Sequence, residues 1–440
     1  MMQEITMEQI LQARDNRAAM QQKFLSTYHV PVICFTMNIA GPVKNSPLIE
    51  KAFEEGVRLL EMRLSAEKIL HKHIFCAPTG CEAMYAVAEN AETLKAICIQ
   101  IEISTPMGRL FDMDVLDCSG QKLSRKEDRS CLVCGAPGRN CASRRLHTIE
   151  ELQLATTQRI KDYFKVTYQL KISHLAVSAL LEEVNTTPKP GLVDRRNNGS
   201  HKDMDLQLFY NSAQSLKGYF AECVAIGQST AALSPEATFA QLRTAGIAAE
   251  KAMYLVTNGV NTHKGAIYSI GILCGALGRL WDIFIEPVNT STIFAQCAAI
   301  AVQAATNDFA SAPTDTAGLQ LYQQLGLTGI RGEVAAGFPS VSDIGLPAYK
   351  NAVAAGLDRQ DAGRIALLHL IAKVKDTNLY HRGGTAGAAW AAKAANALLT
   401  YNSVPTEAQL AELDDAFIVQ NLSPGGCADL LAITYLITAL

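Results

Sequence analysis

Long apolar runs and a large net charge are both absent from this 440-residue chain, whose formal net charge is −3. A membrane-spanning helix needs about 18 consecutive apolar residues, and no such stretch occurs, so we expect no membrane association. The 42 Asp and Glu residues balance the 39 Lys and Arg residues, which leaves no basic field for nucleic acid. Residues 1–23 predict an amphipathic polar helix and lack the apolar core of a signal peptide. We therefore expect a cytoplasmic protein without a membrane or nucleic-acid partner.

Cysteine is not scarce, but its pattern excludes a disulfide-stapled fold. The twelve Cys residues are scattered, and many stand inside apolar runs. Together with the missing signal peptide, this predicts buried thiols of a cytosolic protein rather than a disulfide framework. Examples are Cys34, Cys98, Cys223, Cys274 and Cys297.

The length of the chain predicts two domains, because one ordinary core rarely grows so large. Residues 1–165 mix strand and helix patterns and predict an α/β domain with a mixed sheet. Within it we expect a helix over 47–64, with Ser46 as N-cap and Pro47 at the first helical position. The expected strands cover residues 30–39, 95–103 and 109–117.

Residues 166–440 show almost no strand signal and predict an all-α helical bundle. Ala, Leu and Ile recur at helical spacing, and abundant Ala and Gly favour close helix packing. The domain boundary should lie near residues 150–170, inside a helix that crosses it. The expected helices cover residues 206–227, 236–258, 264–284, 291–309, 347–374, 385–400, 406–420 and 426–440.

The segment 185–205, NTTPKPGLVDRRNNGSHKDMD, concentrates groups that bind metal and phosphate directly before a long apolar helix. Asp194, Asp203 and Asp205 are hard oxygen ligands of the kind that magnesium prefers. The basic residues Lys189, Arg195, Arg196 and Lys202 suit phosphate oxygens. The alternative is a solvated, charged loop that leads into the helix.

Four further polar, Gly-rich loops interrupt the apolar helices of this half. They contain His263 and Lys264, then Arg331, then Asp376 and Arg382, and finally a Pro-Gly-Gly turn at 424–426. Five such loops between helices predict one end of a bundle lined for a highly charged ligand. The chain has neither GxxxxGK followed by Ser or Thr nor GxGxxG, so nucleotide chemistry would use another scaffold.

The motifs TPKPGLVDRRNNGSHKDMD, GVNTHKGAIYSIG, GIRGEVAAGFPSV, DTNLYHRGG and NLSPGGCADLLA resemble the triphosphoribosyl-dephospho-CoA synthase family over roughly residues 168–440. The resemblance implies an all-helical enzyme that couples ATP to dephospho-CoA and releases adenine. The individual roles are our own physical assignments. We assign magnesium binding or base catalysis to Asp194, Asp203, Asp205 and Asp376. We assign phosphate contacts to Lys189, Lys264, Arg331 and Arg382. The two histidines, His201 and His263, are either acids or merely structural groups.

In the first half, GRLFDMDVLD places Asp112 and Asp114 two residues apart on an expected strand. Alternation puts both carboxylates on one face, where a cation relieves their repulsion. A strand carrying two such aspartates suits magnesium in nucleotidyltransferase-like chemistry, although surface strands carry the pattern by chance. Lys44 and Asn45, before the helix at 47, suit phosphate.

The stretch 131–147 follows the spacing C-x2-C-x6-C-x5-H through Cys131, Cys134, Cys141 and His147. Three thiolates and one imidazole match a tetrahedral zinc site. The alternative is free cytosolic cysteines beside a basic run, in which Arg139, Arg144 and Arg145 would meet a pyrophosphate or an acidic partner.

The residues FTMNIAGPVKNSPLI, GRLFDMDVLD, LSRK and CLVCGAPGRNCASRR resemble apo-citrate lyase phosphoribosyl-dephospho-CoA transferase over about residues 10–165. That family attaches the prosthetic-group precursor to a serine of the lyase acyl-carrier subunit and releases pyrophosphate. The resemblance places Arg125 among substrate-binding residues, whereas residues 126–129 depart from the expected hydrophobic continuation. The two halves together predict a bifunctional fusion that uses ATP, dephospho-CoA and Mg2+. Two alternatives stay open: one half is a docking module for citrate lyase, or the helical half is a metal-dependent nucleotide hydrolase.

Overall fold

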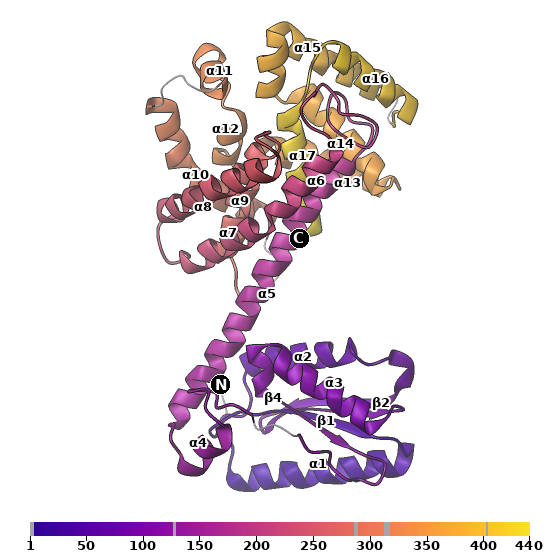
Figure 1. The fold of residues 1–440 in the computed structure, drawn as a ribbon, viewed down its shortest axis with the longest axis vertical. Helices are drawn as coiled ribbons and strands as arrows, with labels where there is room; N and C mark the ends of the chain where they lie inside the picture. The colour runs from indigo at the N-terminus through magenta and orange to yellow at the C-terminus, as the bar shows by residue number, and fades with distance from the viewer. Residues whose placement is uncertain (1–3, 126–128, 286–288, 312–316, 402–403) are drawn as a thin grey trace. The chain divides into compact units, whose positions relative to one another are not determined.

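The computed structural model describes residues 4–125, 129–285, 289–311, 317–401 and 404–440 (Figure 1). The chain divides into two compact units, Met1–Phe164 and Lys165–Leu440, and each has its own hydrophobic core. The division between the two units falls within the helix α5 (Ile149–Asn185). Among the described helices, none is both long and apolar enough to span a bilayer.

The first unit is built on a four-stranded sheet with the order β2-β3-β1-β4. Its strands are β1 (Val32–Met37), β2 (Ile69–Ala77), β3 (Gly80–Val87) and β4 (Phe111–Leu116). All three pairings are antiparallel, so the expectation of a mixed sheet is wrong. Of these strands, β1 and β4 were predicted from the sequence, whereas β2 and β3 were not.

The alternation of side chains along β1 gives the sheet two covered faces. Ile33 and Phe35 enter the larger core, which α2 (Pro47–Glu61) and α3 (Ala91–Ser104) cover with their buried residues. Val32 and Cys34 point the other way, into a smaller core with Phe24 of α1 (Met7–Tyr28). The sheet is therefore enclosed between α1 and the pair α2 and α3. Ser46 caps α2 and Pro47 opens it, as predicted.

The prediction of a strand over residues 95–103 is wrong, because this segment belongs to α3. The Asn90 side chain accepts hydrogen bonds from the N–H groups of Glu92 and Thr93, which fixes a helix start. Leu94, Cys98 and Ile101 then recur at helical spacing and are buried. The alternating isoleucines that suggested a strand do not share one buried face, since Ile103 is 59% exposed.

Buried polar residues of α3 satisfy the outer edge of β4. Lys95 donates to the carbonyl of Met113 at 3.0 Å, and the Met113 N–H donates to Glu102 at 2.8 Å. Glu102 also pairs with Arg125 and Arg129. An edge strand otherwise exposes unpaired backbone groups to further strands, so these contacts end the sheet at β4.

One cysteine pair differs from the expectation of free thiols. Cys76 and Cys81 face each other across the β2–β3 pair and form a disulfide. The other ten cysteines are free, and eight of them are buried. The expectation of buried thiols therefore holds for most of the chain, with a single local exception in a hairpin.

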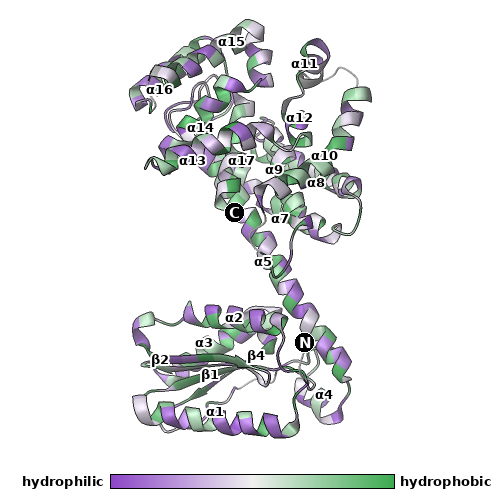
Figure 2. Ribbon diagram, turned by 180° about the vertical axis from the view of Figure 1, so that it is seen from behind, coloured by the Kyte–Doolittle hydropathy of each residue, from purple (hydrophilic) through white to green (hydrophobic). Residues whose placement is uncertain are grey.

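The second unit contains only helices among its described elements. Its core is built from buried side chains of several helices, with many contributed by α9 and α17. Figure 2 shows most of α17 in the hydrophobic colour. The bounds are α6 (Leu206–Ser215), α7 (Lys217–Ser229), α8 (Pro235–Val256), α9 (Lys264–Arg279), α10 (Thr290–Ser311), α11 (Ala317–Leu325), α12 (Gly329–Ala335), α13 (Leu346–Ala354), α14 (Arg359–Lys373), α15 (Thr377–Tyr401), α16 (Glu407–Val419) and α17 (Gly425–Ala439). This agrees with the all-α expectation.

Two of the expected helices are divided. The segment 347–374 forms α13 and α14, because Gly356 has a φ of 87° and Asp358 caps the second helix. A residue with positive φ ends a helix, and glycine accepts that conformation without strain. The segment 206–227 likewise forms α6 and α7, which meet at Leu216.

Candidate functional site

A cavity of about 450 Å³ lies in the helical unit where three helices begin. The starts of α9, α15 and α17 contribute Lys264, Thr377 and Gly425 to its wall. A helix start presents free N–H groups and the positive end of the helix dipole, so it attracts anions. Six residues selected from the sequence line the cavity, namely Lys189, His201, His263, Lys264, Arg331 and Arg382.

Three of these cations are paired with carboxylates. The buried Lys189 lies 2.5 Å from Glu183 of α5. Lys264 lies 3.1 Å from Glu250, and Arg331 lies 3.0 Å from Asp308. The pairs at Lys264 and Arg331 are partly exposed, so an incoming phosphate can compete for these two cations at little cost.

His263 is buried at the start of α9 with one ring nitrogen satisfied. Its Nδ1 lies 2.7 Å from the Ser212 hydroxyl, which itself accepts a hydrogen bond from Thr262. With Thr262 donating, the Ser212 proton is available to Nδ1, so Nε2 carries the ring hydrogen. That Nε2 has no partner among the described residues. Burial, and secondarily the Lys189 charge, lower the His263 pKa to about 3, so the ring is a neutral N–H donor.

His201 joins the 185–205 loop to the segment before α17. Its Nδ1 accepts a hydrogen bond from Arg382 at 3.2 Å, and its Nε2 lies 2.9 Å from the Ser423 hydroxyl. Burial, followed by the Arg382 charge, lowers the His201 pKa to about 4. Arg382 also donates to the Ser200 carbonyl at 2.9 Å. Both residues therefore line the cavity while they hold two loops together.

Three carboxylates of the cavity wall were missed among the assigned site residues. Glu183 lies on α5, Glu250 on α8, and Asp429 in the first turns of α17. Burial, and then the charges of Glu183 and Asp376, raise the Asp429 pKa well above its usual value. No hydrogen bond to the Asp429 carboxylate occurs within the described part of the chain. A Cβ at Gly265 would approach the Asp429 Oδ2 to 2.0 Å, so this carboxylate packs directly against the start of α9.

The four aspartates chosen from the sequence are not gathered into one cluster. Asp194 accepts N–H bonds from Lys189 and Arg196, at 2.8 and 2.7 Å, inside its own loop. Asp205 caps α6. Asp376 accepts from the N–H groups of Asn378 and Cys427, at 2.7 and 2.8 Å, and so joins the starts of α15 and α17.

Asp203 is exposed near His201 and Arg382. The neighbouring basic residues of the same loop serve the protein itself: Arg196 pairs with Asp414 of α16 at 2.5 Å. The loop of residues 185–205 thus shapes the cavity mainly through its backbone and through Lys189 and His201.

In the first unit, Asp112 and Asp114 share one face of β4, as their spacing predicts. Their partners across the strand pair are Thr36 and Cys34 of β1, and this face carries the smaller core beside α1. Asp112 lies 3.1 Å from Arg129, and Asp114 lies 2.5 Å from Lys122. Both carboxylates are therefore balanced by separate protein cations.

A third carboxylate, Glu82 of β3, belongs to the same face and was missed. It occupies the position opposite Thr36, on the other side of β1 from Asp112. Arg17 of α1 lies 2.5 Å from Glu82. Burial alone would lower the Arg17 pKa, but the hydrogen bond to Glu82 and the charges of Glu82 and Asp112 raise it above the usual value. Nothing in the sequence near Glu82 suggested a site, because β3 itself was not predicted.

The three substrate-binding residues assigned to the first unit make internal contacts. Lys44 donates to the Ile39 carbonyl at 2.5 Å. Asn45 donates to Glu50 at 2.7 Å and to the Ala77 carbonyl at 3.1 Å, which links α2 to the β2–β3 turn. Arg125 pairs with the buried Glu102. Of the divergent segment 126–129, residues 126–128 lie outside the described part, and Arg129 contacts both Glu102 and Asp112.

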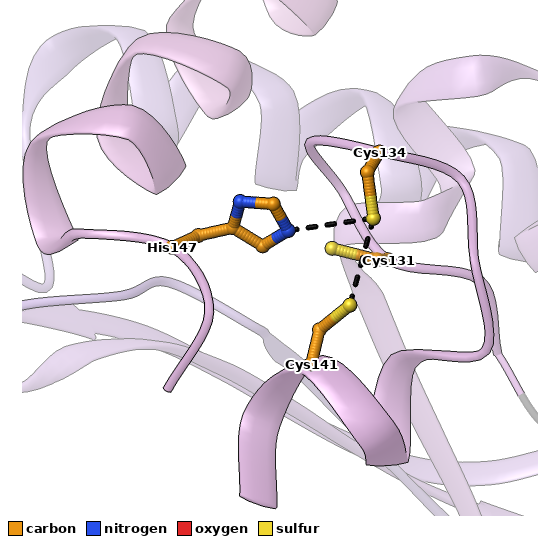
Figure 3. Close-up of side chains that lie close together, drawn as sticks. All are labelled: Cys131, Cys134, Cys141 and His147. Carbon is orange, nitrogen blue, oxygen red and sulfur yellow. Dashed lines mark hydrogen bonds between the residues drawn. The ribbon is translucent and has the colours of Figure 1, made fainter. Parts of the chain in front are cut away.

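Cys131, Cys134, Cys141 and His147 come together in the first unit (Figure 3). Their ligand atoms all lie within 4.8 Å of one another. Among the described residues, the one other group of three with this property contains the disulfide pair Cys76 and Cys81 together with Glu50.

Comparison with known proteins identifies both halves. Residues 169–440 match the family model of ATP:dephospho-CoA triphosphoribosyl transferase (CitG), and residues 5–163 match that of apo-citrate lyase phosphoribosyl-dephospho-CoA transferase (CitX). The chain is also 37% identical to Protein CitXG of Haemophilus influenzae over 453 aligned positions, which cover 98% of this chain and 95% of that protein. The chain therefore belongs to the CitX–CitG fusion family and is a bifunctional transferase of citrate lyase prosthetic-group biosynthesis.

Proposed function

We propose that the helical unit binds ATP and dephospho-CoA in the 450 Å³ cavity and forms 2'-(5''-triphosphoribosyl)-3'-dephospho-CoA and adenine there. The observation that carries this proposal is the meeting of three helix starts, cationic side chains and three carboxylates around one cavity. An adjoining cavity of about 200 Å³ shares Glu250, Lys264, Tyr268 and Arg331 with the first. We assign the two adjoining cavities to the two substrates.

The triphosphate of ATP would be held by the starts of α9, α15 and α17 together with Lys264 and Arg331. Backbone N–H groups at helix starts and long cationic side chains are the usual partners of phosphate oxygens. Lys189 is a different case because it is buried and closely paired with Glu183. We assign it to positioning that carboxylate rather than to a free phosphate contact.

Magnesium fits this cavity through Glu183. Mg2+ is commonly held by one or two carboxylates plus substrate phosphates, with water completing the octahedron. Glu183 lines the cavity, and burial raises its pKa above the usual value, so a cation beside it would offset the cost of its charge. When bound, the ion would neutralise phosphate charge as the reaction proceeds.

The reaction itself exchanges one bond at the ATP ribose. The 2'-oxygen of dephospho-CoA forms a bond to C1', the C1'–N9 bond breaks, and the bonding electrons leave with adenine, which takes up one proton while the 2'-hydroxyl gives one up. We assign Asp429 as the base that takes the 2'-hydroxyl proton, because its raised pKa brings it closer to the operating pH. The neutral Nε2–H of His263 would donate a hydrogen bond to the departing base or to a phosphate.

The dependence of adenine release on dephospho-CoA separates a transferase from a hydrolase. The purified chain is incubated with ATP and Mg2+, with and without dephospho-CoA, and adenine is measured by chromatography. We expect adenine only when dephospho-CoA is present. Equal release without it would favour the hydrolase alternative.

For the first unit, we propose transfer of phosphoribosyl-dephospho-CoA to a serine of the apo-citrate lyase acyl-carrier subunit, with release of pyrophosphate. Asp112, Asp114 and Glu82 lie on one sheet face and support a magnesium–pyrophosphate site there. The acyl-carrier partner follows from the family description and, like a cytoplasmic location, is part of the proposal.

Mass spectrometry of the apo-carrier after incubation with this protein, ATP, dephospho-CoA and Mg2+ tests both steps. We expect the mass of the complete prosthetic group on one serine. The double variant Asp112→Asn, Asp114→Asn should still release adenine but lose carrier loading, whereas Asp15→Asn, at an exposed position of α1, should behave as wild type. Normal loading by the double variant would refute the metal role and favour a docking role for this face.

A further inference from the structure

The segment 129–151 gathers four potential metal ligands that neither transferase reaction uses. Cys131 and Cys134 come from a tight turn, Cys141 from the short helix α4 (Gly138–Arg144), and His147 from the residues before α5. In Figure 3 the three sulfurs and the imidazole point toward a common centre. Their ligand atoms all lie within 4.8 Å of one another.

The distances match a bound zinc ion. Tetrahedral coordination at the usual Zn–S and Zn–N lengths places sulfurs about 3.8 Å apart, and sulfur and nitrogen about 3.6 Å apart. The Cys134 and Cys141 sulfurs are separated by 3.5 Å, and the His147 Nε2 lies 3.4 Å from the Cys134 sulfur. An ion at the centre needs only a few tenths of an ångström of outward movement.

The backbone around the first two cysteines is shaped to present them. Cys131 N–H donates to the Ala136 carbonyl at 2.6 Å, and Gly135 N–H donates to the Cys131 carbonyl at 3.2 Å. Gly135 has a φ of 74°, and no atom lies within 4 Å of the place where a Cβ would stand. The backbone N–H groups of Val133 and Cys134 are directed at the Cys131 sulfur. This turn therefore holds two sulfurs in fixed positions.

The second nitrogen of His147 lies near a carboxylate, although the separation is longer than a hydrogen bond. Its Nδ1 lies 3.8 Å from Glu151 of α5, while Nε2 faces the sulfurs. Metal-bound histidines usually donate their other N–H to a carboxylate or carbonyl, which fixes the ring. Three thiolates and a divalent ion carry a net charge of −1, and the basic residues Arg139, Arg144 and Arg145 of the same segment offset it.

We propose that Cys131, Cys134, Cys141 and His147 bind one structural zinc ion. Three sulfurs and one nitrogen in tetrahedral arrangement select zinc among the common metals, and four protein ligands leave no open position for catalysis. The ion joins the turn, α4 and the start of α5. It thereby fixes the segment whose carbonyls at Ser130 and Leu132 accept hydrogen bonds from Arg109 and Arg159, at 2.6 and 2.9 Å.

The metal content of the full-length protein tests this site without reference to either activity. The chain is purified under reducing conditions without chelator, and its zinc content is measured by inductively coupled plasma mass spectrometry. We expect one zinc per chain in the wild type and in Cys118→Ser, which changes an exposed free cysteine of the same unit. Cys134→Ser and Cys141→Ser should lose it. A wild-type protein without stoichiometric zinc, or variants that keep it, would overturn the proposal.

Cobalt substitution and a ligand exchange keep the test decisive if the serine variants fold poorly. Replacing zinc with Co2+ in the wild type should give the strong visible bands of a tetrahedral site and a thiolate-to-cobalt charge-transfer band. His147→Cys should retain the ion and strengthen that charge-transfer band. An octahedral cobalt spectrum, or a Cys134–Cys141 disulfide in protein kept reduced during purification, would contradict the assignment.

Discussion

At the scale of single residues, the helical cavity depends on close packing between a glycine and a carboxylate. Gly265 leaves the space that Asp429 fills. Sequence reasoning found the loop that contains Lys264 and Gly265, and it noted Asp429, but it could not show that these residues touch. They are more than 160 positions apart in the chain, and only packing of α9 against α17 brings them together.

Gly265→Ala should therefore displace the proposed base. The added Cβ would come within 2.0 Å of Asp429 Oδ2, and a shift of about 1 Å at a reacting group costs on the order of 100-fold in rate. We expect adenine release to fall by about that factor while the far-ultraviolet circular dichroism spectrum is unchanged. Gly218→Ala in α7 is the matched control, because no atom lies within 4 Å of its added Cβ. Equal rates for the two variants would exclude the contact.

Asp429→Asn should stabilise the helical unit at neutral pH while it removes activity. Because burial raises the Asp429 pKa above its ordinary 3.8, the folded state binds this proton more tightly than the unfolded state does. The resulting loss in the free energy of unfolding is absent below pH 3.8. It grows as the pH rises toward the pKa of the folded state and stays constant above that pKa. The melting temperature of the variant should exceed that of wild type at pH 8, and the gap should shrink in acid. Glu412→Gln, at an exposed position, should show no such trend.

At the scale of elements, the sequence predicted what local signals determine and missed what depends on tertiary contacts. The N-cap Ser46 and the apolar run of β1 identify α2 and β1 correctly. In α3, the alternating isoleucines favoured a strand in the sequence. The segment is nevertheless a helix, because Asn90 caps its start and its buried residues pack against the sheet. The strand β2 was missed because the side chains on both of its faces are largely exposed, which leaves no clear alternation.

The site residues follow the same division. Local chemistry identified the cations and histidines around the cavity, whereas its carboxylate Glu183 is hidden inside a 37-residue helix. The aspartates that stand out in the sequence, Asp194, Asp205 and Asp376, bind backbone N–H groups instead. Polar loop residues must first satisfy the buried backbone around them, and a single sequence does not show which of them are left for a ligand.

Removing Glu102 should destabilise the first unit strongly. The carboxylate is buried, accepts the Met113 N–H and pairs with Arg125 and Arg129. Breaking a buried ion pair by removing one partner costs about 3–5 kcal/mol. We expect Glu102→Ala to lower the free energy of unfolding by about that amount in urea, against less than about 1 kcal/mol for Glu92→Ala in the exposed first turn of the same helix. A loss as small as that of the control would show that the network contributes little.

At the scale of the whole molecule, the two units have separate cores although α5 runs through both. Ile160 of α5 belongs to the core of the first unit, and Ile172 of the same helix belongs to the core of the second. No buried residue is shared between these clusters among those described. Each unit therefore has the apolar interior that independent folding requires.

Differential scanning calorimetry of the full chain should show two transitions that respond to different substitutions. Glu102→Ala should lower only one of them, and Asp429→Asn should raise only the other. Assigning each transition by the variant that moves it requires no separated fragments. A single transition moved by both substitutions would mean that α5 couples the two cores into one cooperative unit.

The two buried imidazoles have a further consequence for the living cell. With pKa values of about 4 and about 3, His201 and His263 keep their charge constant over any acidity that a cell tolerates. Mild acid would therefore leave both imidazoles uncharged. Any loss of adenine release at low pH would come from protonation of the carboxylates around the cavity, Asp429 among them.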